Sequence, residues 1–238
     1  IVILMESFGA SWNEFNQKNF NFLGELESYF REGYYFENII SADNGTIGSL
    51  MSVATNLPVI PGMPHLPQSK FMRVKLPSSS HIPFKRSGYE TNFIYGGKLG
   101  WRDIGRYFRL QGYDQVVGEN KIKKDLALNG TVGSEWGLFD EHFFEFILKK
   151  VSSAKKPQFF LGLSTTNHPP FLVPTSFNAS ELSIPMELES QILRERKLFL
   201  ERFRAFQYAN YKLVEFIKKV RSTKIRDSTI LAITGDDN

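Results

Sequence analysis

The chain has 238 residues, of which 42% are hydrophobic and 14% aromatic, so it can bury a substantial core as one domain and is not a disordered chain. Its formal net charge of +4 permits an anionic partner such as phosphate or a lipid surface, but no long basic run indicates nucleic-acid binding. Cysteine is absent, which excludes disulfides, thiolate metal sites and cysteine nucleophiles.

The first part of the chain predicts two strands and a helix. Residues 1–5 form a continuous apolar run, typical of a strand buried on both faces of a parallel sheet. We expect a helix near residues 22–30 and a strand over 34–40. Residues 58–83 contain six prolines, which favour an irregular excursion of the chain.

Between these segments lies a turn that leads into a helix. Asn44-Gly45 is a strong turn dipeptide, because both residues tolerate positive φ. From Thr46 onward, apolar residues recur at helical spacing at Ile47, Leu50, Met51 and Ala54. The pattern places a hydroxyl at the positive end of a helix, where backbone N–H groups attract an anion.

The remainder alternates strands with helices. Strands are predicted at 89–95, 158–164 and 229–234, and helices at 103–110, 140–151 and 187–221. This alternation predicts an α/β fold with a mostly parallel central sheet flanked by helices. Because both ends of the sequence lie at or beside a strand, we expect residues 1–238 to be one domain cut at both ends, with the sheet truncated on its C-terminal side. No signal peptide or membrane span is visible in it.

Functional groups of open α/β sheets lie just beyond the carboxyl ends of the strands. Glu6 follows the first predicted strand, His168 follows the strand at 158–164, and Asp236 and Asp237 follow the last one. With Thr46 they should converge on one edge of the sheet. An oxygen-rich site of this kind suits Mn²⁺ or Mg²⁺, which would turn the Thr46 hydroxyl into a useful nucleophile for phosphoryl transfer.

Each of these residues also has a structural explanation. Thr46 could be only a helix N-cap, and Glu6 and Asp236 could be ordinary polar ends of strands. His168 precedes two prolines and could merely pack in a rigid loop. Trp101-Arg102 could be a core aromatic beside a solvated charge, or a clamp on a phosphate-bearing substrate.

Six blocks of sequence occur in one order: residues 1–9 (IVILMESFG), 44–46 (NGT), 88–97 (GYETNFIYGG), 112–114 (GYD), 166–171 (TNHPPF) and 233–236 (ITGD). Together they resemble the lipoteichoic acid synthase and phosphoglycerol transferase branch of the alkaline phosphatase/sulfatase superfamily. The resemblance spans nearly the whole chain, so we expect residues 1–238 to be a sulfatase-like catalytic domain.

The resemblance implies a Mn²⁺-dependent enzyme anchored in the bacterial cell membrane by segments outside this chain, with its catalytic domain on the extracytoplasmic side. Such an enzyme moves phosphoglycerol from phosphatidylglycerol to an envelope glycan or glycerol-phosphate acceptor through a phosphothreonine intermediate. Carried over by motif, Thr46 is the nucleophile, and Glu6, Asp236 and Thr46 hold the metal. His168 would bind the glycerol-phosphate group, and Trp101 and Arg102 lie in the region of the other head-group residues.

One position departs from the family pattern, because Asp237 stands where the family has a histidine after Gly-Asp. A carboxylate there would add negative charge and favour Mg²⁺ or Ca²⁺, or weaken function. The chain also lacks the Cys or Ser nucleophile followed by Pro and Arg of true sulfatases, so sulfate ester cleavage is not expected. Alternatives are a phosphoethanolamine transferase, a phosphodiesterase, or a relative that binds phosphate-bearing polymer without cleaving it.

Overall fold

Five parallel strands form the centre of the computed structural model, which describes residues 1–9, 16, 20–36, 38–179, 184–192 and 195–236. In spatial order they are β3 (Gln115–Val117), β2 (Glu90–Tyr95), β4 (Gln158–Leu163), β1 (Val2–Met5) and β5 (Ala232–Gly235). Every neighbouring pair is parallel, and Val2 pairs with Leu161 on one side and Ala232 on the other. The predicted α/β architecture is therefore confirmed.

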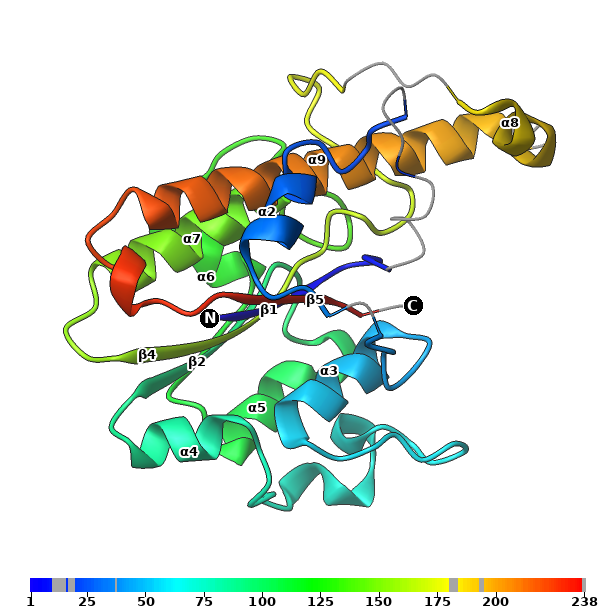
Figure 1. Ribbon diagram of the computed structural model, residues 1–238. Coiled ribbons are helices and arrows are strands. Elements are labelled where there is room, and N and C mark those ends of the chain that lie inside the picture. Colours follow the sequence, from blue (N-terminus) through cyan, green and yellow to red (C-terminus); the bar gives the residue numbers. More distant parts are fainter. Residues whose placement is uncertain (10–15, 17–19, 37, 180–183, 193–194, 237–238) are drawn as a thin grey trace.

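Helices cover both faces of this sheet (Figure 1). One layer contains α2 (Leu26–Glu32), α6 (Glu119–Asp125), α7 (Asp140–Ser152) and the long α9 (Arg196–Arg221), with α8 (Met186–Ile192) beside the start of α9. The other layer contains α3 (Thr46–Thr55), α4 (His81–Arg86) and α5 (Ile104–Gln111). Short 3₁₀ turns occur at Leu66–Gln68, Lys70–Arg73, Trp101–Asp103 and Arg226–Ser228.

Alternate residues of each strand supply the two cores between these layers. Ile3 and Met5 pack with the helices of the α7 and α9 layer, whereas Leu4 packs with α3 and α5. On the α7 face, Gly162 leaves room for Phe143, since a Cβ at Gly162 would lie 2.8 Å from the ring. Burial on both faces explains why the strands are continuous apolar runs.

Several boundaries differ from the predictions. The strand predicted over 34–40 is wrong, because the described residues of that segment are irregular and largely exposed, with no neighbouring strand to complete a ladder. The helix expected near 22–30 begins only at Leu26, and the pattern over 187–221 is divided between α8 and α9. The proline-rich stretch ends in α4, which was not predicted, and neither β3 nor α6 was predicted.

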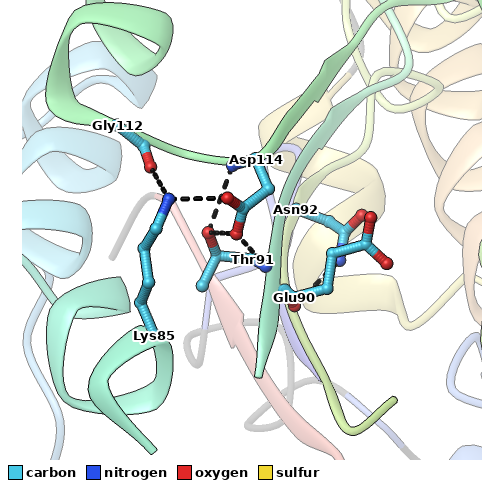
Figure 2. Close-up of polar contacts among 6 residues, drawn as sticks. All are labelled: Lys85, Glu90, Thr91, Asn92, Gly112 and Asp114. Carbon is cyan, nitrogen blue, oxygen red and sulfur yellow. Dashed lines mark hydrogen bonds and ion pairs between the residues drawn. The ribbon is translucent and has the colours of Figure 1, made fainter. Parts of the chain in front are cut away.

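The Gly112-Tyr-Asp114 block precedes β3 and is hydrogen-bonded to α4 and to the start of β2 (Figure 2). Asp114 Oδ2 accepts hydrogen bonds from the backbone N–H and the hydroxyl of Thr91, at 2.9 and 2.8 Å. Lys85 Nζ donates to Asp114 Oδ1 at 2.6 Å and to the Gly112 carbonyl at 2.7 Å. Partial burial opposes ionisation of Asp114, but the hydrogen bonds from Lys85 and Thr91 outweigh it and lower the pKa of this carboxyl.

Replacing Asp114 with Ala should destabilise the domain by roughly 3 kcal/mol, since the loss leaves buried donors of Thr91 without their acceptor. Urea denaturation followed by circular dichroism measures the change. Asp125→Ala is the matched control, because Asp125 forms an exposed i,i+4 pair with Lys121 that contributes only about 0.3–0.5 kcal/mol. Equal effects of the two substitutions would show that the Asp114 network does not stabilise the sheet edge.

Candidate functional site

Two carboxylates lie side by side at the carboxyl ends of β1 and β5. Met5 pairs with Gly235, so Glu6 and Asp236 occupy the next position of neighbouring parallel strands. Asp236 is fully buried and Glu6 is only 9% exposed. The backbone N–H of Ser7 donates to Asp236 Oδ1 at 2.7 Å, which fixes the orientation of that carboxylate.

The first turn of α3 packs against the same place. Ser49 Oγ donates a hydrogen bond of 2.7 Å to the Asp236 carbonyl, so the helix begins beside the end of β5 (Figure 1). Gly45 occupies the N-cap position and Thr46 is the first helical residue, so the N-cap explanation does not account for Thr46. A side chain at Gly48 would overlap the Asp43 carboxylate, and glycine therefore allows the preceding loop to lie close to the helix.

The loop after β4 is joined to the end of β1. The Glu6 N–H donates to Ser164 Oγ at 3.0 Å, and Asn167 Nδ2 donates to the Ser7 carbonyl at 3.1 Å. His168 follows in this loop, half-buried, with its Nδ1 2.9 Å from the Pro169 carbonyl. The imidazole also stacks on Trp136, with ring centroids 3.7 Å apart. The structure thus brings the His168 loop to the edge that carries Glu6 and Asp236.

The buried carboxylate of Asp140 accepts hydrogen bonds from the start of that loop. Asp140, the first residue of α7, is 1% exposed, and its Oδ1 accepts hydrogen bonds from the N–H groups of Thr165 and Thr166. Burial raises the pKa of Asp140 to about 6, although these hydrogen bonds oppose the rise. The folded domain therefore binds a proton here at pH values where the unfolded chain has lost it.

This proton should make stability depend on pH between about 4 and 6. The raised folded-state pKa means that stability falls as pH increases through this window, by roughly 3 kcal/mol at 1.4 kcal/mol per pKa unit. Asparagine at position 140 cannot ionise, so Asp140→Asn lacks this pH-dependent loss. Relative to the wild type, the variant should therefore be more stable at pH 7 than at pH 4. Urea denaturation at both pH values measures this. Exposed Glu145→Gln is the control, and an equal shift there would contradict the assignment to Asp140.

The two residues predicted in the head-group region make different contacts, and Trp101 packs beside Tyr95. Its ring centroid is 6.0 Å from that of Tyr95, the last residue of β2. Arg102 is exposed, has a φ of 48°, and donates to Gln68 Oε1 at 3.3 Å. Its described contact therefore lies with the neighbouring 3₁₀ turn and not with Glu6 or Asp236.

The pKa of Tyr95 reflects the negative charge of the carboxylates at the site. Burial, followed by the negative charges of Glu6, Glu119 and Asp236, raises the pKa of its phenol far above the usual value. Glu119 follows β3, is buried, and lies 3.6 Å from Lys123. Three carboxylates therefore act on one buried phenol at this edge of the sheet.

The donor set fits a hard divalent cation. Glu6 and Asp236 offer carboxylate oxygens from adjacent strand ends, and Ser49, in the first turn of the helix that begins at Thr46, donates to the Asp236 carbonyl. Within the described ranges, no group of three or more His, Asp or Glu side chains is arranged to hold a metal. Asp237 lies outside the described residues, so the prediction that it is a ligand stays a prediction.

Sequence reasoning missed several residues that shape the site. Ser7, Ser49, Ser164 and Asn167 link the strand ends to one another, and Trp136 covers His168. Asn167 belongs to the TNHPPF block and Ser7 to the first block, so proximity to recognised motifs could have indicated both. Trp136 has no such signal, because its contact with His168 spans 32 positions and depends on the fold.

An all-parallel sheet covered by helices on both faces, with polar side chains where its strands end, defines an α/β protein. The chain belongs to the sulfatase family, whose family model matches residues 1–237. Among the described residues, no helix is both long and apolar enough to cross a membrane.

Three known proteins illustrate the relationship. Phosphoglycerol transferase I of Citrobacter koseri is 20% identical over 156 residues, which are 64% of this chain and 19% of the relative. A Vibrio parahaemolyticus protein of the alkaline phosphatase superfamily superposes with a TM-score of 0.80 at 22% identity, over 99% of this chain and 53% of its own. The lipoteichoic acid synthase LtaP of Listeria monocytogenes gives a TM-score of 0.76 at 18% identity, over 99% of this chain and 55% of its own. The chain thus spans about half the length of these solved relatives.

Proposed function

We propose that this domain transfers phosphoglycerol from a phospholipid head group to an envelope acceptor. The observation that carries the proposal is the convergence of Glu6, Asp236 and the first turn of α3 at one edge of the sheet. The similarity to a phosphoglycerol transferase over 64% of the chain favours this donor over other phosphate esters.

In the proposed reaction, Thr46 Oγ attacks the phosphorus of phosphatidylglycerol as its hydroxyl proton is lost. The bond from phosphorus to the diacylglycerol oxygen breaks, and diacylglycerol leaves after taking up a proton. Thr46 then carries the phosphoglycerol group. An acceptor hydroxyl, such as that of a glycan or of glycerol phosphate, attacks the same phosphorus and loses its proton. The bond from phosphorus to Thr46 Oγ breaks, and Thr46 Oγ takes up a proton.

The surrounding residues assist by position. Thr46 is the first residue of α3, so the positive end of this ten-residue helix faces the phosphoryl oxygens. Glu6, Asp236 and Thr46 would hold Mn²⁺ or Mg²⁺, which supplies charge neutralisation and activation of the hydroxyl when bound. His168 and Trp101 would contact the glycerol-phosphate head group, with Arg102 on the outer side of Trp101.

The same proposal places the domain outside the bacterial cell membrane. Phosphatidylglycerol is a membrane lipid, so the domain would work at the bilayer surface, held there by segments outside residues 1–238. The mildly basic net charge of +4 is compatible with approach to an anionic surface.

A second candidate is a relative that binds phosphate-bearing polymer without cleaving it. The departure at Asp237 favours this candidate, because it replaces the nitrogen ligand that the family resemblance leads one to expect. Metal analysis separates the two. Stoichiometric Mn²⁺ or Mg²⁺ supports the enzyme, and a protein that takes up neither supports the binder.

Product analysis tests the transferase. The protein, incubated with Mn²⁺ and vesicles of either phosphatidylglycerol or phosphatidylethanolamine, should release diacylglycerol only from phosphatidylglycerol. Release from phosphatidylethanolamine alone would identify a phosphoethanolamine transferase, and free glycerol phosphate without an acceptor product would identify a phosphodiesterase. Release from neither lipid by a metal-loaded protein would contradict the proposal.

A further inference from the structure

Trp136 and His168 stack on each other in the loops beside the proposed site. The ring centroids are 3.7 Å apart with an interplanar angle of 29°. The two residues come from different loops: Trp136 precedes α7, and His168 follows β4. A contact between loops that distant in sequence requires both backbones to be held in place.

The backbone around Trp136 is anchored to the end of β2. Gly97 and Gly137 form an isolated bridge, and the Leu138 N–H donates to the Gly96 carbonyl at 2.9 Å. The Trp136 N–H donates to Ser134 Oγ at 3.2 Å. A larger residue at position 97 would clash with the neighbouring backbone, because its Cβ would lie 2.6 Å from the Trp136 carbonyl oxygen. The indole is therefore carried by a fixed segment.

The imidazole is constrained on two sides. Its Nδ1 faces the Pro169 carbonyl at 2.9 Å, and because a carbonyl only accepts hydrogen bonds, Nδ1 carries the proton in that contact. Nε2 is then the ring nitrogen left for a ligand. The indole covers one face of the ring, so rotation of His168 about its side-chain bonds would break the stack.

We infer that Trp136 is a positioning residue, which fixes the imidazole of His168 so that Nε2 faces the head group of the substrate. The inference rests on the proposed function, because it assigns a purpose to His168 in binding a glycerol-phosphate group. Trp136 itself acts through His168, on which it stacks.

Nuclear magnetic resonance of the chain tests the stack and its effect together. The chain has four histidines, and the His168 ring-proton signals are identified by their loss in His168→Ala. In the wild type these signals should be shifted upfield by the indole, and in Trp136→Leu they should move to the positions of an unstacked imidazole. Trp136→Phe retains an aromatic face and should keep much of the shift.

The same samples are titrated with sn-glycerol 1-phosphate in the presence of Mg²⁺. Trp136→Leu should raise the dissociation constant about tenfold, whereas Trp136→Phe should remain within about threefold of the wild type. The double variant Trp136→Leu/His168→Ala should bind no more weakly than His168→Ala alone, because the effect of Trp136 passes through His168.

The outcomes separate the two proposals. An upfield shift together with unchanged affinity in Trp136→Leu would overturn the positioning role. Additive losses in the double variant would overturn it too, because Trp136 would then act independently of His168. If the shift is present and the wild type binds no glycerol phosphate, the proposed function is wrong and Trp136 serves only the packing of the loops.

Discussion

Thr46→Ala should abolish turnover of phosphatidylglycerol, with a loss of about 10³-fold or more, because the substitution removes the oxygen atom proposed to attack the phosphorus of the lipid. The fold should survive, since Thr46 is the first residue of α3, its hydroxyl is not the N-cap, and alanine is a better helix former. Diacylglycerol release measures turnover, and thermal unfolding verifies the fold.

The matched control is Thr46→Ser, which keeps a hydroxyl at the same position and should retain measurable turnover. Intact-mass spectrometry after exposure to phosphatidylglycerol provides a second readout. The wild type should gain the mass of a phosphoglycerol group, and Thr46→Ala should gain none. Turnover by Thr46→Ala at the wild-type rate would show that another residue is the nucleophile.

Asp236→Asn should remove most of the affinity for Mn²⁺ while leaving the domain folded. The amide oxygen can still accept the hydrogen bond from Ser7, and the carbonyl of residue 236 still accepts from Ser49, so the contacts of the strand end persist. The negative charge is lost, however. Because changes outside the ligand shell already cost about 10- to 100-fold in metal affinity, loss of a direct ligand should cost about 100-fold or more.

Isothermal titration with Mn²⁺ measures this affinity without relying on activity. Glu119→Gln is the matched control, because Glu119 also acts on Tyr95 but lies near Lys123 in α6. It should leave the affinity within about threefold of the wild type, because Glu119 is not a proposed ligand and its carboxylate lies beside Lys123. Unchanged Mn²⁺ binding by Asp236→Asn would refute the assignment of Asp236 as a ligand.

The sequence predicts the central features of this molecule because their signals are local. Apolar runs identify β1, β4 and β5, and a mixed segment closed by Gly96-Gly97 identifies β2. Parallel pairing then places Glu6 beside Asp236. The Asn44-Gly45 turn and the helical spacing after it locate the start of α3 within one residue of the structure. These inferences need no knowledge of distant contacts.

The features that the sequence did not predict depend on contacts between distant residues. β3 has only three residues, too few for a pattern, and forms because β2 offers an edge. The segment 34–40 has a strand-like composition, but its aromatic residues instead line a cavity of about 750 Å³ beside α2 and the end of α9. Likewise, the stack of Trp136 on His168 exists only because the loops around β2 and β4 lie next to each other.

Strand β2 runs from the Asp114 network, at the amino-terminal ends of the strands, to the candidate site at their carboxyl ends. Thr91 binds Asp114 near its start, and Tyr95 lies among the carboxylates at its end, about 13 Å away at the rise of an extended strand. Substitutions that alter ligand preference therefore fall far from the Asp114 contacts, which join the start of β2 to the residues before β3. Because of this separation, the domain is evolvable. Relatives can acquire new donor lipids or acceptor molecules while the scaffold keeps its resistance to unfolding.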